Sequence, residues 1–334
     1  MKSRRTDISI IYQGKNITTD LKPYLKGFTY TDCASGEADT ISLDISDIYK
    51  KWIDAWFPTK TDSISAAIEV ADWNREGDNW TLDCGQFTVD GISFSGPPVS
   101  LKLDAISTPV SESFDCRNNT KTWEKTTLQA IAAKIAGDAG VSLSYEASAI
   151  TIKVLEQSEE TDMSFLDKLC RDYGLAMKVY GKKIIIFDEE AYEAKASVRT
   201  LSELDVISWS GKTTLTGIAD GAVIKYRDPK SGKDMSYTYN APKSNNRPTH
   251  KLQESNQKAD SLDDARKKAK AMVRDANKDE TTMSLKLDAH KGLVSTQNVD
   301  IKNFGKFDGK YFIEKITHNI GGGYTMDLEA RRVE

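Results

Sequence analysis

Alternation of apolar and polar side chains dominates residues 7–106, and this period of two sends every second side chain to the same face of a strand. The alternating apolar positions are Ile8/Ile10/Tyr12, Ile41/Leu43/Ile45, Ile64/Ala66/Ile68/Val70, Phe87/Val89 and Val99/Leu101/Leu103/Ala105. Roughly six short strands at such spacing are typical of a β-barrel or a β-sandwich. We therefore predict a first all-β domain over residues 1–110.

One segment of this region departs from the alternation. Over residues 47–57, apolar side chains recur at helical spacing, and Pro58 then stops the pattern because proline cannot continue a helix. These apolar residues are Ile48, Trp52, Ile53 and Trp56. We predict a helical insert that packs against the first domain.

Helical spacing takes over beyond residue 110. Thr126 and Gln129 have the spacing of a capping box, and an apolar stripe then ends near Gly137 and Gly140. The stripe consists of Leu128, Ile131, Ala132, Ile135 and Ala136. A second helix, which Gly174 terminates, carries Phe165, Leu166, Leu169, Cys170 and Tyr173. With strands expected at 141–145, 150–154, 175–180 and 183–187, residues 111–197 are predicted to form a small α+β domain.

Strand patterns return after residue 198 and predict a second all-β domain over residues 198–334. They cover 206–209, 222–226, 235–239, 283–287, 311–320 and 324–330. The polar stretch 227–260 contains Pro229, Pro242 and Pro248 and is short of apolar side chains that could offset the entropy of ordering. We expect this stretch to be mobile, or ordered only by a partner, in the isolated protein.

A helix is predicted over residues 261–276, with Ser261 as its cap. Its apolar stripe is Leu262, Ala265, Ala269, Met272, Val273 and Ala276. The opposite face carries Arg266, Lys267, Lys268, Lys270 and Arg274. A solvated outer face is the favoured interpretation of these cations, and contact with an acidic partner is the alternative.

Composition and charge narrow the class of protein. The chain has 334 residues, 39% hydrophobic and 29% charged, as expected for a folded soluble protein of about two domains. Its apolar runs are too short for a spanning helix, so we expect no membrane insertion. A net charge of -4 gives no reason to expect nucleic-acid binding. The 4 cysteines are too far apart in sequence for a zinc or redox motif, and we expect free thiols.

Several motifs resemble known catalytic or binding loops, but each lacks a residue or a spacing that the loop requires. Residues 210–213 resemble the end of a phosphate-binding loop, but Val206 stands where that loop needs glycine. Residues 91–96 have one residue too many for a nucleophile elbow. Residues 275–279 imitate a calcium loop, yet Lys286 occupies the position of its bidentate glutamate. Residues 72–77 come closer to such a loop, but a connecting turn is the favoured interpretation.

The histidines do not form a metal site either. His250, His290 and His318 are far apart in sequence, and none belongs to a His-Glu-x-x-His motif. Some pair of acidic residues always lies at a distance suited to glycoside hydrolysis, so carboxylates alone are no evidence of catalysis. We assign no catalytic, cofactor-binding or metal-binding residue, and we expect the protein not to be an enzyme.

A series of small motifs runs nearly from end to end of the chain. Its members are Tyr30-Thr31-Asp32, Ala38-Asp39-Thr40, the string from Asp44 to Trp56 with Trp52 and then Pro58, Gly85-x-Phe87-x-Val89-Asp90, Gly96-Pro97-Pro98, Leu128 with Ile131-Ala132, Asp162 with Phe165-Leu166, Gly174, and Tyr311-Phe312-Ile313 through Thr317-His318 to Tyr324. In this order and spacing, the chain resembles the bacteriophage late control protein D family, the baseplate hub proteins of contractile tails and related injection systems.

The resemblance implies a mainly β fold in which two β-barrel tube domains flank the α+β insertion. It further implies a homotrimer, whose six barrels form a ring that adapts a threefold central spike to the sixfold tail tube. No sequence repeat relates residues 1–110 to 198–334, so the likeness of these two domains is implied by the family alone.

The resemblance also implies where the protein acts and what it meets. Its partners would be the tail tube protein, the central spike protein and other baseplate proteins. We expect synthesis in the bacterial cytoplasm, followed by incorporation into a phage tail or a tail-like bacteriocin. Because the chain ends at Glu334 directly after its second β domain, we expect a separate spike protein, and we expect the mature protein to begin at Met1.

Two other classes of function stay open at this stage. The first is a tail-associated enzyme that degrades cell walls, for which no nucleophile or metal set is recognisable. The second is a carbohydrate-binding tip protein, which would need exposed aromatic platforms. Trp52, Trp56 and Trp209 lie in patterns that point to a core, which leaves Trp73, Trp80 and Trp123 as the candidates for such a platform.

Overall fold

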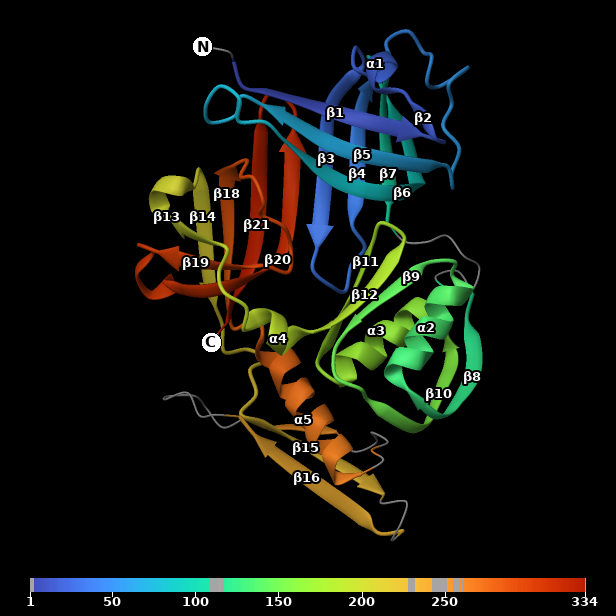
Figure 1. The fold of residues 1–334 in the computed structure, drawn as a ribbon, viewed down its shortest axis with the longest axis vertical. Coiled ribbons are helices and arrows are strands. Elements are labelled where there is room, and N and C mark those ends of the chain that lie inside the picture. The colour runs from blue at the N-terminus through green and yellow to red at the C-terminus, as the bar shows by residue number, and fades with distance from the viewer. Residues whose placement is uncertain are drawn as a thin grey trace.

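In the computed structural model, the strands that are described form four sheets, of 13, 2, 3 and 3 strands. The structure describes residues 3–107, 114, 117–227, 232–241, 251–254, 259 and 261–333. The fold is mainly β, as the alternating patterns predict. Figure 1 shows an N-terminal β unit above, a C-terminal β unit beside it, and two smaller units that contain the longer helices below.

The N-terminal β unit contains one short helix, α1 (Thr18–Leu21), and seven strands. The strands are β1 (Arg5–Tyr12), β2 (Lys15–Asn16), β3 (Leu25–Cys33), β4 (Thr40–Ser46), β5 (Ser63–Ala71), β6 (Trp80–Ser95) and β7 (Ser100–Ile106). Their alternating apolar side chains are buried, as in Ile41, Leu43 and Ile45 of β4. β6 is long enough to pair with β5 along its first half and with β7 along its second half.

The α+β unit follows, and its two longer helices contact both of its sheets. Its elements are β8 (Asn119–Thr127), α2 (Leu128–Asp138), β9 (Ser142–Glu146), β10 (Thr151–Glu160), α3 (Asp162–Asp172), β11 (Leu175–Tyr180), β12 (Lys183–Asp188) and α4 (Glu189–Glu193). The predicted stripe of α2 is entirely buried, and α3 buries Phe165, Leu166, Leu169 and Cys170. The helices and both hairpin arms around Gly181 are therefore confirmed.

Two details of this unit differ from the prediction. The unit begins with strand β8, which pairs with β10, so that β9 pairs with β12 instead, in parallel. The cap of α2 is Thr127, whose hydroxyl accepts a hydrogen bond from the backbone N–H of Ala130 (3.2 Å), and not Thr126. β8 is rich in Thr and Lys, with Trp123 as its one large buried residue, so it carries no clear alternation of apolar side chains.

The C-terminal β unit is interrupted by a fourth unit. Its own elements are β13 (Arg199–Ser202), the 3-10 turn η2 (Glu203–Asp205), β14 (Ser208–Thr213), β18 (Thr281–Asp288), β19 (Asn298–Lys302), the 3-10 turn η3 (Gly305–Phe307), β20 (Gly309–Ile320) and β21 (Tyr324–Val333). The inserted unit consists of β15 (Gly221–Arg227), β16 (Asp234–Asn240), β17 (Lys251–Glu254) and α5 (Leu262–Asn277).

This inserted unit corrects the expected position of two strands and of the helix at 261–276. Residues 222–226 and 235–239 do form strands, but in a separate three-stranded sheet that packs on α5 around its own small core. Of the predicted stripe of α5, Ala265, Ala269, Met272 and Val273 therefore pack on this sheet and not on the rest of the C-terminal β unit, whereas Leu262 is exposed. The stretch 227–260, which we expected to be mobile, contains β16 and β17, and its remaining residues lie largely outside those described.

The two larger β units share one order of strand pairing. The order is β3-β4-β7-β6-β5 in the N-terminal unit and β14-β18-β21-β20-β19 in the C-terminal unit. In each unit the chain also passes through the five strands in the same succession. β6 thus corresponds to β20, and β3 corresponds to β14, a correspondence that the amino-acid sequence alone does not reveal.

The two β units join edge to edge in one continuous sheet. β20 pairs with β3 in antiparallel register, from Lys315 opposite Cys33 to Ile320 opposite Phe28. Behind this junction, buried side chains from both units belong to one core cluster. The Trp73 indole N–H reaches across it to the carbonyl oxygen of Ala289 (2.8 Å).

The predicted helical insert at 47–57 is wrong, because the segment is a series of turns. The Asp47 carboxylate accepts hydrogen bonds from the backbone N–H groups of Trp52 (3.0 Å) and Ile53 (2.9 Å). Lys50 has a left-handed backbone with φ of 55°. Local side-chain bonding of this kind competes with helix formation. Ile48 and Trp56 are exposed as a result.

Candidate assembly surface

Several strands of the main sheet have an edge with no neighbour among the described residues. β14 pairs with β18 alone, β13 with β19 alone and β2 with β1 alone, and residues 91–95 of β6 pair with β7 alone. An unpaired edge presents a row of backbone N–H and C=O groups that can pair with another chain. The edges of β14 and of residues 91–95 of β6 are the two whose counterparts, in β3 and β20, are paired with each other within the chain.

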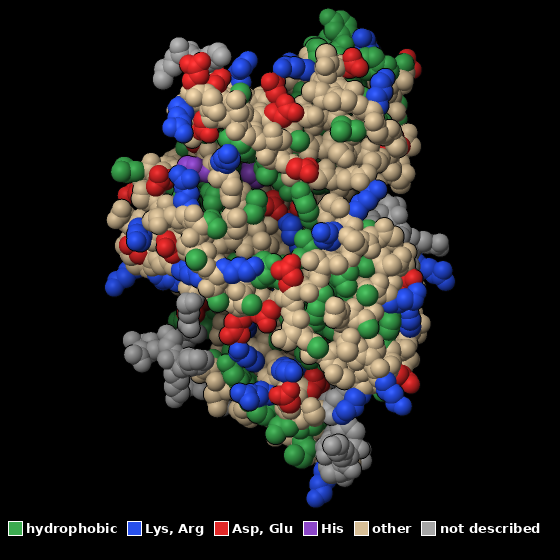
Figure 2. Space-filling model, viewed as in Figure 1, with side chains coloured by type: hydrophobic (Ala, Val, Ile, Leu, Met, Phe, Trp, Pro, Cys, Tyr) green, Lys and Arg blue, Asp and Glu red, His purple; other side chains and the backbone are tan. Residues whose placement is uncertain are grey.

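Large apolar side chains are exposed beside both edges. Near β14 lie Leu204, Ile207 and Trp209, which are 98%, 56% and 41% exposed and are called the β14 cluster here. Near β6 lie Trp56 (43% exposed) and Phe57 (55% exposed), and Phe57 stacks on Phe94 of β6 with ring centroids 5.7 Å apart; these three form the aromatic ridge. Figure 2 shows hydrophobic side chains gathered at the end of the molecule formed by the N-terminal β unit.

The exposure of the tryptophans is nearly the reverse of the prediction. Trp56 and Trp209 are exposed, whereas Trp73 and Trp123, two candidates for a carbohydrate platform, are buried. Trp123 stacks on Phe165 in the core of the α+β unit, with centroids 6.3 Å apart. Trp80 is partly buried against Tyr324. The predicted platform is therefore wrong at Trp73 and Trp123.

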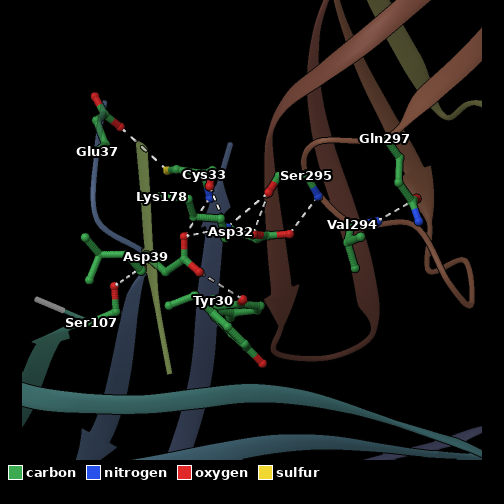
Figure 3. A network of polar contacts seen from close by, with 12 residues as sticks. Tyr30, Asp32, Cys33, Glu37, Asp39, Ser107, Lys178, Val294, Ser295 and Gln297 are labelled. Atoms are coloured by element: carbon green, nitrogen blue, oxygen red, sulfur yellow. Dashed lines mark hydrogen bonds and ion pairs between the residues drawn. The ribbon is translucent and has the colours of Figure 1, made fainter. Parts of the chain in front are cut away.

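A buried polar network lies where the α+β unit meets both β units (Figure 3). The ammonium of Lys178, on β11, donates hydrogen bonds to Asp32 Oδ1 (2.5 Å) and Asp39 Oδ1 (3.1 Å). It also donates to the carbonyl oxygen of Cys33 (2.5 Å) and to Ser295 Oγ (3.1 Å). Asp32 is the second-last residue of β3, Asp39 precedes β4, and Ser295 precedes β19, so one cation links three units.

The carboxylates of this network keep other donors as well. Asp32 accepts from the backbone N–H and the hydroxyl of Ser295, each at 2.7 Å. Asp39 accepts from the backbone N–H of Cys33 (2.9 Å) and the hydroxyl of Tyr30 (3.4 Å). Buried charges are tolerated when they are paired and hydrogen-bonded in this way.

Burial and charge act in opposite directions on the pKa values here. Burial raises the pKa of Asp39 to about 6, although Lys178 partly counteracts this. Burial also works against the charge of Lys178, but Asp32 and Asp39 outweigh it and raise its pKa above the usual value. An ammonium so stabilised is a poor nucleophile. The geometry therefore suits a structural joint better than a catalytic group.

Only part of this network was singled out from the sequence, and its structural role was not predicted. Asp32 and Asp39 belong to motifs that carry the family resemblance. The role of Lys178 was missed. A charged residue in the otherwise apolar strand Leu175–Tyr180, which is buried on both faces, is the feature that could have indicated a buried ion pair. Ser295 gave no signal, since it lies far along the chain in a connecting segment.

A second ionic cluster corrects the expectation for the basic face of α5. Arg274 contacts Glu193 of α4 (2.6 Å), and Lys270 contacts Glu190 (2.6 Å). Arg331 of β21 contacts Glu189 of α4 (3.0 Å). Figure 2 shows acidic and basic side chains intermixed over this region. Arg266, Lys267 and Lys270 are exposed as predicted, whereas Lys268 is buried and Arg274 is partly buried. The acidic partner of Lys270 and Arg274 is α4 of the same chain.

The rejected motifs occupy structural positions. Residues 210–213 belong to β14, and 91–95 belong to β6. The Asn277 amide bonds both backbone groups of Ala219 (2.7 and 2.9 Å) and fixes the end of α5. Asp72 accepts from the backbone N–H of Gly77 (2.8 Å) in the turn between β5 and β6, which confirms a connecting turn.

Histidine and cysteine side chains are likewise placed apart. His318 is buried between Tyr30 (ring centroids 5.4 Å apart) and the hydroxyl of Tyr324 (2.8 Å from Nδ1). Cys33, Cys84 and Cys170 are buried free thiols, while His250 and Cys116 lie outside the described residues. In the part of the chain that is described, no cluster of three or more His, Cys, Asp or Glu residues is arranged to hold a metal.

Comparison with known proteins identifies the family. Residues 108–324 match the family described as phage tail baseplate hub (GPD). The chain belongs to this baseplate hub family. Probable baseplate hub proteins of Escherichia phages P2 and 186 are each 26% identical to it, over 235 and 239 residues. These matches cover 67% and 69% of this chain but 58% and 59% of the relatives, so the chain spans less than two thirds of their length.

Solved structures support the same fold for the hub chain over nearly its whole length. A tail protein from Neisseria meningitidis MC58 superposes with a TM-score of 0.74 at 12% identity, covering 98% of this chain and 96% of that protein. The 43 kDa tail protein of prophage MuSo2 from Shewanella oneidensis gives 0.72 at 13% identity, with 98% of both chains covered. An Escherichia coli component of the type VI secretion system gives 0.59 at 10% identity, covering 93% and 74%.

None of the described helices is both long and apolar enough to cross a membrane. The family and the relatives are named for a place in the tail baseplate, which is a part of the virion.

Proposed function

We propose that this chain is the structural hub of a contractile tail or injection particle and assembles as a homotrimer. The observation that carries the proposal is the shared pairing order of the two β units, together with the junction that β20 and β3 form between them. In this trimer, residues 1–110 and 198–334 act as two tube domains, and residues 111–197 form the insertion between them.

The argument for a ring follows from the correspondence of the strands. Within one copy, β20 of the C-terminal unit pairs with β3 of the N-terminal unit. β6 corresponds to β20, and β14 corresponds to β3. If β6 makes the contact that β20 makes, its partner is the counterpart of β3, which is β14. We take this β14 to belong to another copy of the chain. Such a contact is heterologous and closes into a ring when the rotation between copies allows it.

Three copies with two β units each would give a ring of six similar units. This ring would offer approximate sixfold symmetry to the tail tube while keeping threefold symmetry for the central spike and other baseplate proteins. The N- and C-terminal units differ in their loops and insertions, so only the strands of the sheet, and not the connections between them, would follow the approximate sixfold symmetry. Synthesis in the bacterial cytoplasm and incorporation into the particle belong to the same proposal.

The test is a cross-link designed from the junction inside the chain. Thr317 of β20 lies opposite Thr31 of β3, and the corresponding positions at the open edges are Ser93 and Lys212. A Ser93→Cys, Lys212→Cys double variant, treated with a mild oxidant or a short bismaleimide, should give covalent trimers. Their mass should be about 111 kDa, three times the 37.1 kDa of the chain.

Controls separate this result from random thiol chemistry. Each single variant should give no covalent trimer. A Ser93→Cys, Ser284→Cys variant, whose second cysteine lies on β18 inside the sheet, should give none either. The homotrimer is refuted if no trimer appears by mass in solution and the double variant stays uncrosslinked at every concentration tested.

A structural role without catalysis is part of this proposal. It is supported by the naming of the relatives as baseplate hub proteins and by the buried, charged state of Lys178. A zymogram on host peptidoglycan checks it. Clear lysis by the purified protein would favour the alternative, a cell-wall-degrading enzyme.

A further inference from the structure

We infer that, at each junction between copies, the β14 cluster of one copy packs on the aromatic ridge of the next. The inference rests on the homotrimer proposed above and names the side chains that hold it together. The occupant of each exposed apolar surface is thus a second copy of this chain.

The first argument is that Leu204 is held outward by a rigid turn. Asp205 accepts hydrogen bonds from the backbone N–H (2.8 Å) and the hydroxyl (2.7 Å) of Ser202, which fixes η2. Leu204 sits at the tip of this turn, almost fully exposed. Contiguous exposed apolar patches on soluble proteins mark interaction sites. A fixed, exposed leucine next to an open sheet edge is suited to insert into a partner.

The second argument is one of position along the paired edges. Leu204 and Ile207 come directly before β14, and Phe94 lies near the end of β6. In an antiparallel pair, the start of one strand lies beside the end of the other. Pairing β14 with β6 of the next copy therefore brings the β14 cluster to the aromatic ridge. A direction of pairing opposite to that of the β20–β3 junction would keep them apart.

The third argument is that the junction inside the chain already has such a contact. Trp73, in the connection between β5 and β6, crosses the junction to Ala289, which follows β18. In the C-terminal unit the corresponding connection, β19 to β20, carries Phe304 and Phe307. These rings contact Trp209 of β14, with centroids 5.1 and 6.4 Å apart. The segment that follows β4, and so corresponds to Ala289, carries Trp56 and Phe57 of the aromatic ridge.

The fourth argument is charge complementarity. Lys51 lies over the Trp56 ring, with Nζ 4.9 Å from its centroid, and the neighbouring Lys50 is exposed. Glu203, beside Leu204, is exposed in η2. Docking the β14 cluster on the ridge places this carboxylate near the two lysines. Opposite charges at the rim of an apolar contact favour the correct partner and register.

The experiment compares assembly with folding in the full chain. A Leu204→Asp, Ile207→Asp variant should need at least tenfold more protein to reach half trimer, measured by mass photometry or sedimentation. Its melting temperature at concentrations where the protein is monomeric should stay unchanged, because these side chains are exposed within the chain. Leu262→Asp is the matched control, since Leu262 is an exposed leucine on α5 far from both edges, and it should leave assembly unchanged.

A charge exchange tests the register of the contact. Glu203→Lys and Lys51→Glu should each weaken the trimer, and the double exchange should restore it at least in part. Unchanged assembly in the Leu204→Asp, Ile207→Asp variant, with Ser93–Lys212 cross-linking intact, would overturn this inference and leave the homotrimer standing. Absence of both trimer and cross-link in otherwise wild-type protein would overturn the homotrimer and this inference together.

Discussion

Replacing Lys178 with methionine should destabilise the protein more than any surface change, because it leaves two carboxylates buried without their cation. The side chain of Lys178 is 10% exposed, and those of Asp32 and Asp39 are 6% and 0% exposed. Removing one partner of a buried ion pair costs about 3–5 kcal/mol. Ser295 and the backbone of Cys33 still donate to the carboxylates, so we expect a value near the lower end, about 3 kcal/mol.

The assay is thermal unfolding at pH 8 with urea denaturation as a second measure. A loss of about 3 kcal/mol should lower the melting temperature by roughly 4 °C if all 334 residues unfold together, and by roughly 6–12 °C if a unit of about 150–250 residues unfolds on its own. The Lys178→Met, Asp39→Asn double variant should regain part of that loss, because it removes one unpaired charge together with the cation. The sum of the two single-variant losses should exceed the loss of unfolding free energy in the double variant, because the two residues are in contact.

Acidification gives an independent check with a defined sign. Asp39 already has its pKa raised from 3.8 to about 6, and removing Lys178, which lowers this pKa, should raise it further. A buried carboxyl with a raised pKa binds a proton more tightly when folded, so the fold gains stability as the pH falls through that pKa. The deficit of Lys178→Met should therefore shrink between pH 8 and pH 5. Melting indistinguishable from wild type at pH 8, or a deficit that does not depend on pH, would refute the reasoning.

Two further predictions follow from the buried groups. Burial lowers the pKa of His318 from 6.5 to about 4, so its contribution to stability is full above pH 6.5 and is lost as the pH falls toward 4. His318→Phe should therefore flatten this part of the curve of melting temperature against pH. Asp39→Asn should remove a slope of opposite sign over a similar pH range. Arg331→Met should cost about 3 kcal/mol in urea denaturation, the lower end for a broken buried ion pair, because Arg274 still pairs with Glu189 and Glu193. Lys267→Glu on the exposed face of α5 should change stability by less than about 0.5 kcal/mol. Similar losses for these two variants would show that the buried cluster adds nothing.

The regular elements were predictable wherever one periodic pattern controlled the segment. The alternation in β4, β5 and β7 and the stripe of α2 each place apolar side chains on one face, and that face is buried. At 47–57 the same method failed, because tryptophan spacing typical of a helix was outweighed by the hydrogen bonds that the Asp47 carboxylate accepts from the backbone N–H groups of Trp52 and Ile53.

The assembly surface was less accessible to sequence reasoning. Whether Trp56 or Trp73 is buried depends on which unit packs over it, and Trp73 is covered by residues more than 200 positions away in the chain. Lys178, Asp32 and Ser295 come together only once three units have docked. The corresponding strands of the two β units share their order of pairing but have no recognisable sequence similarity, so no internal repeat in the sequence could reveal the correspondence.

The unit formed by β15–β17 and α5 leaves and re-enters the sheet at a single point. Thr213 ends β14 directly opposite Thr281, which begins β18, and their hydroxyls lie 3.2 Å apart. The unit also has a small core of its own. An element attached this way can diverge, lengthen or be exchanged during evolution with little effect on the strands that carry it, provided that the ion pairs of Lys270 and Arg274 with α4 are kept or replaced. In protein engineering, the link between these two threonines is therefore a natural graft point, where a foreign domain with closely spaced ends could replace the native one.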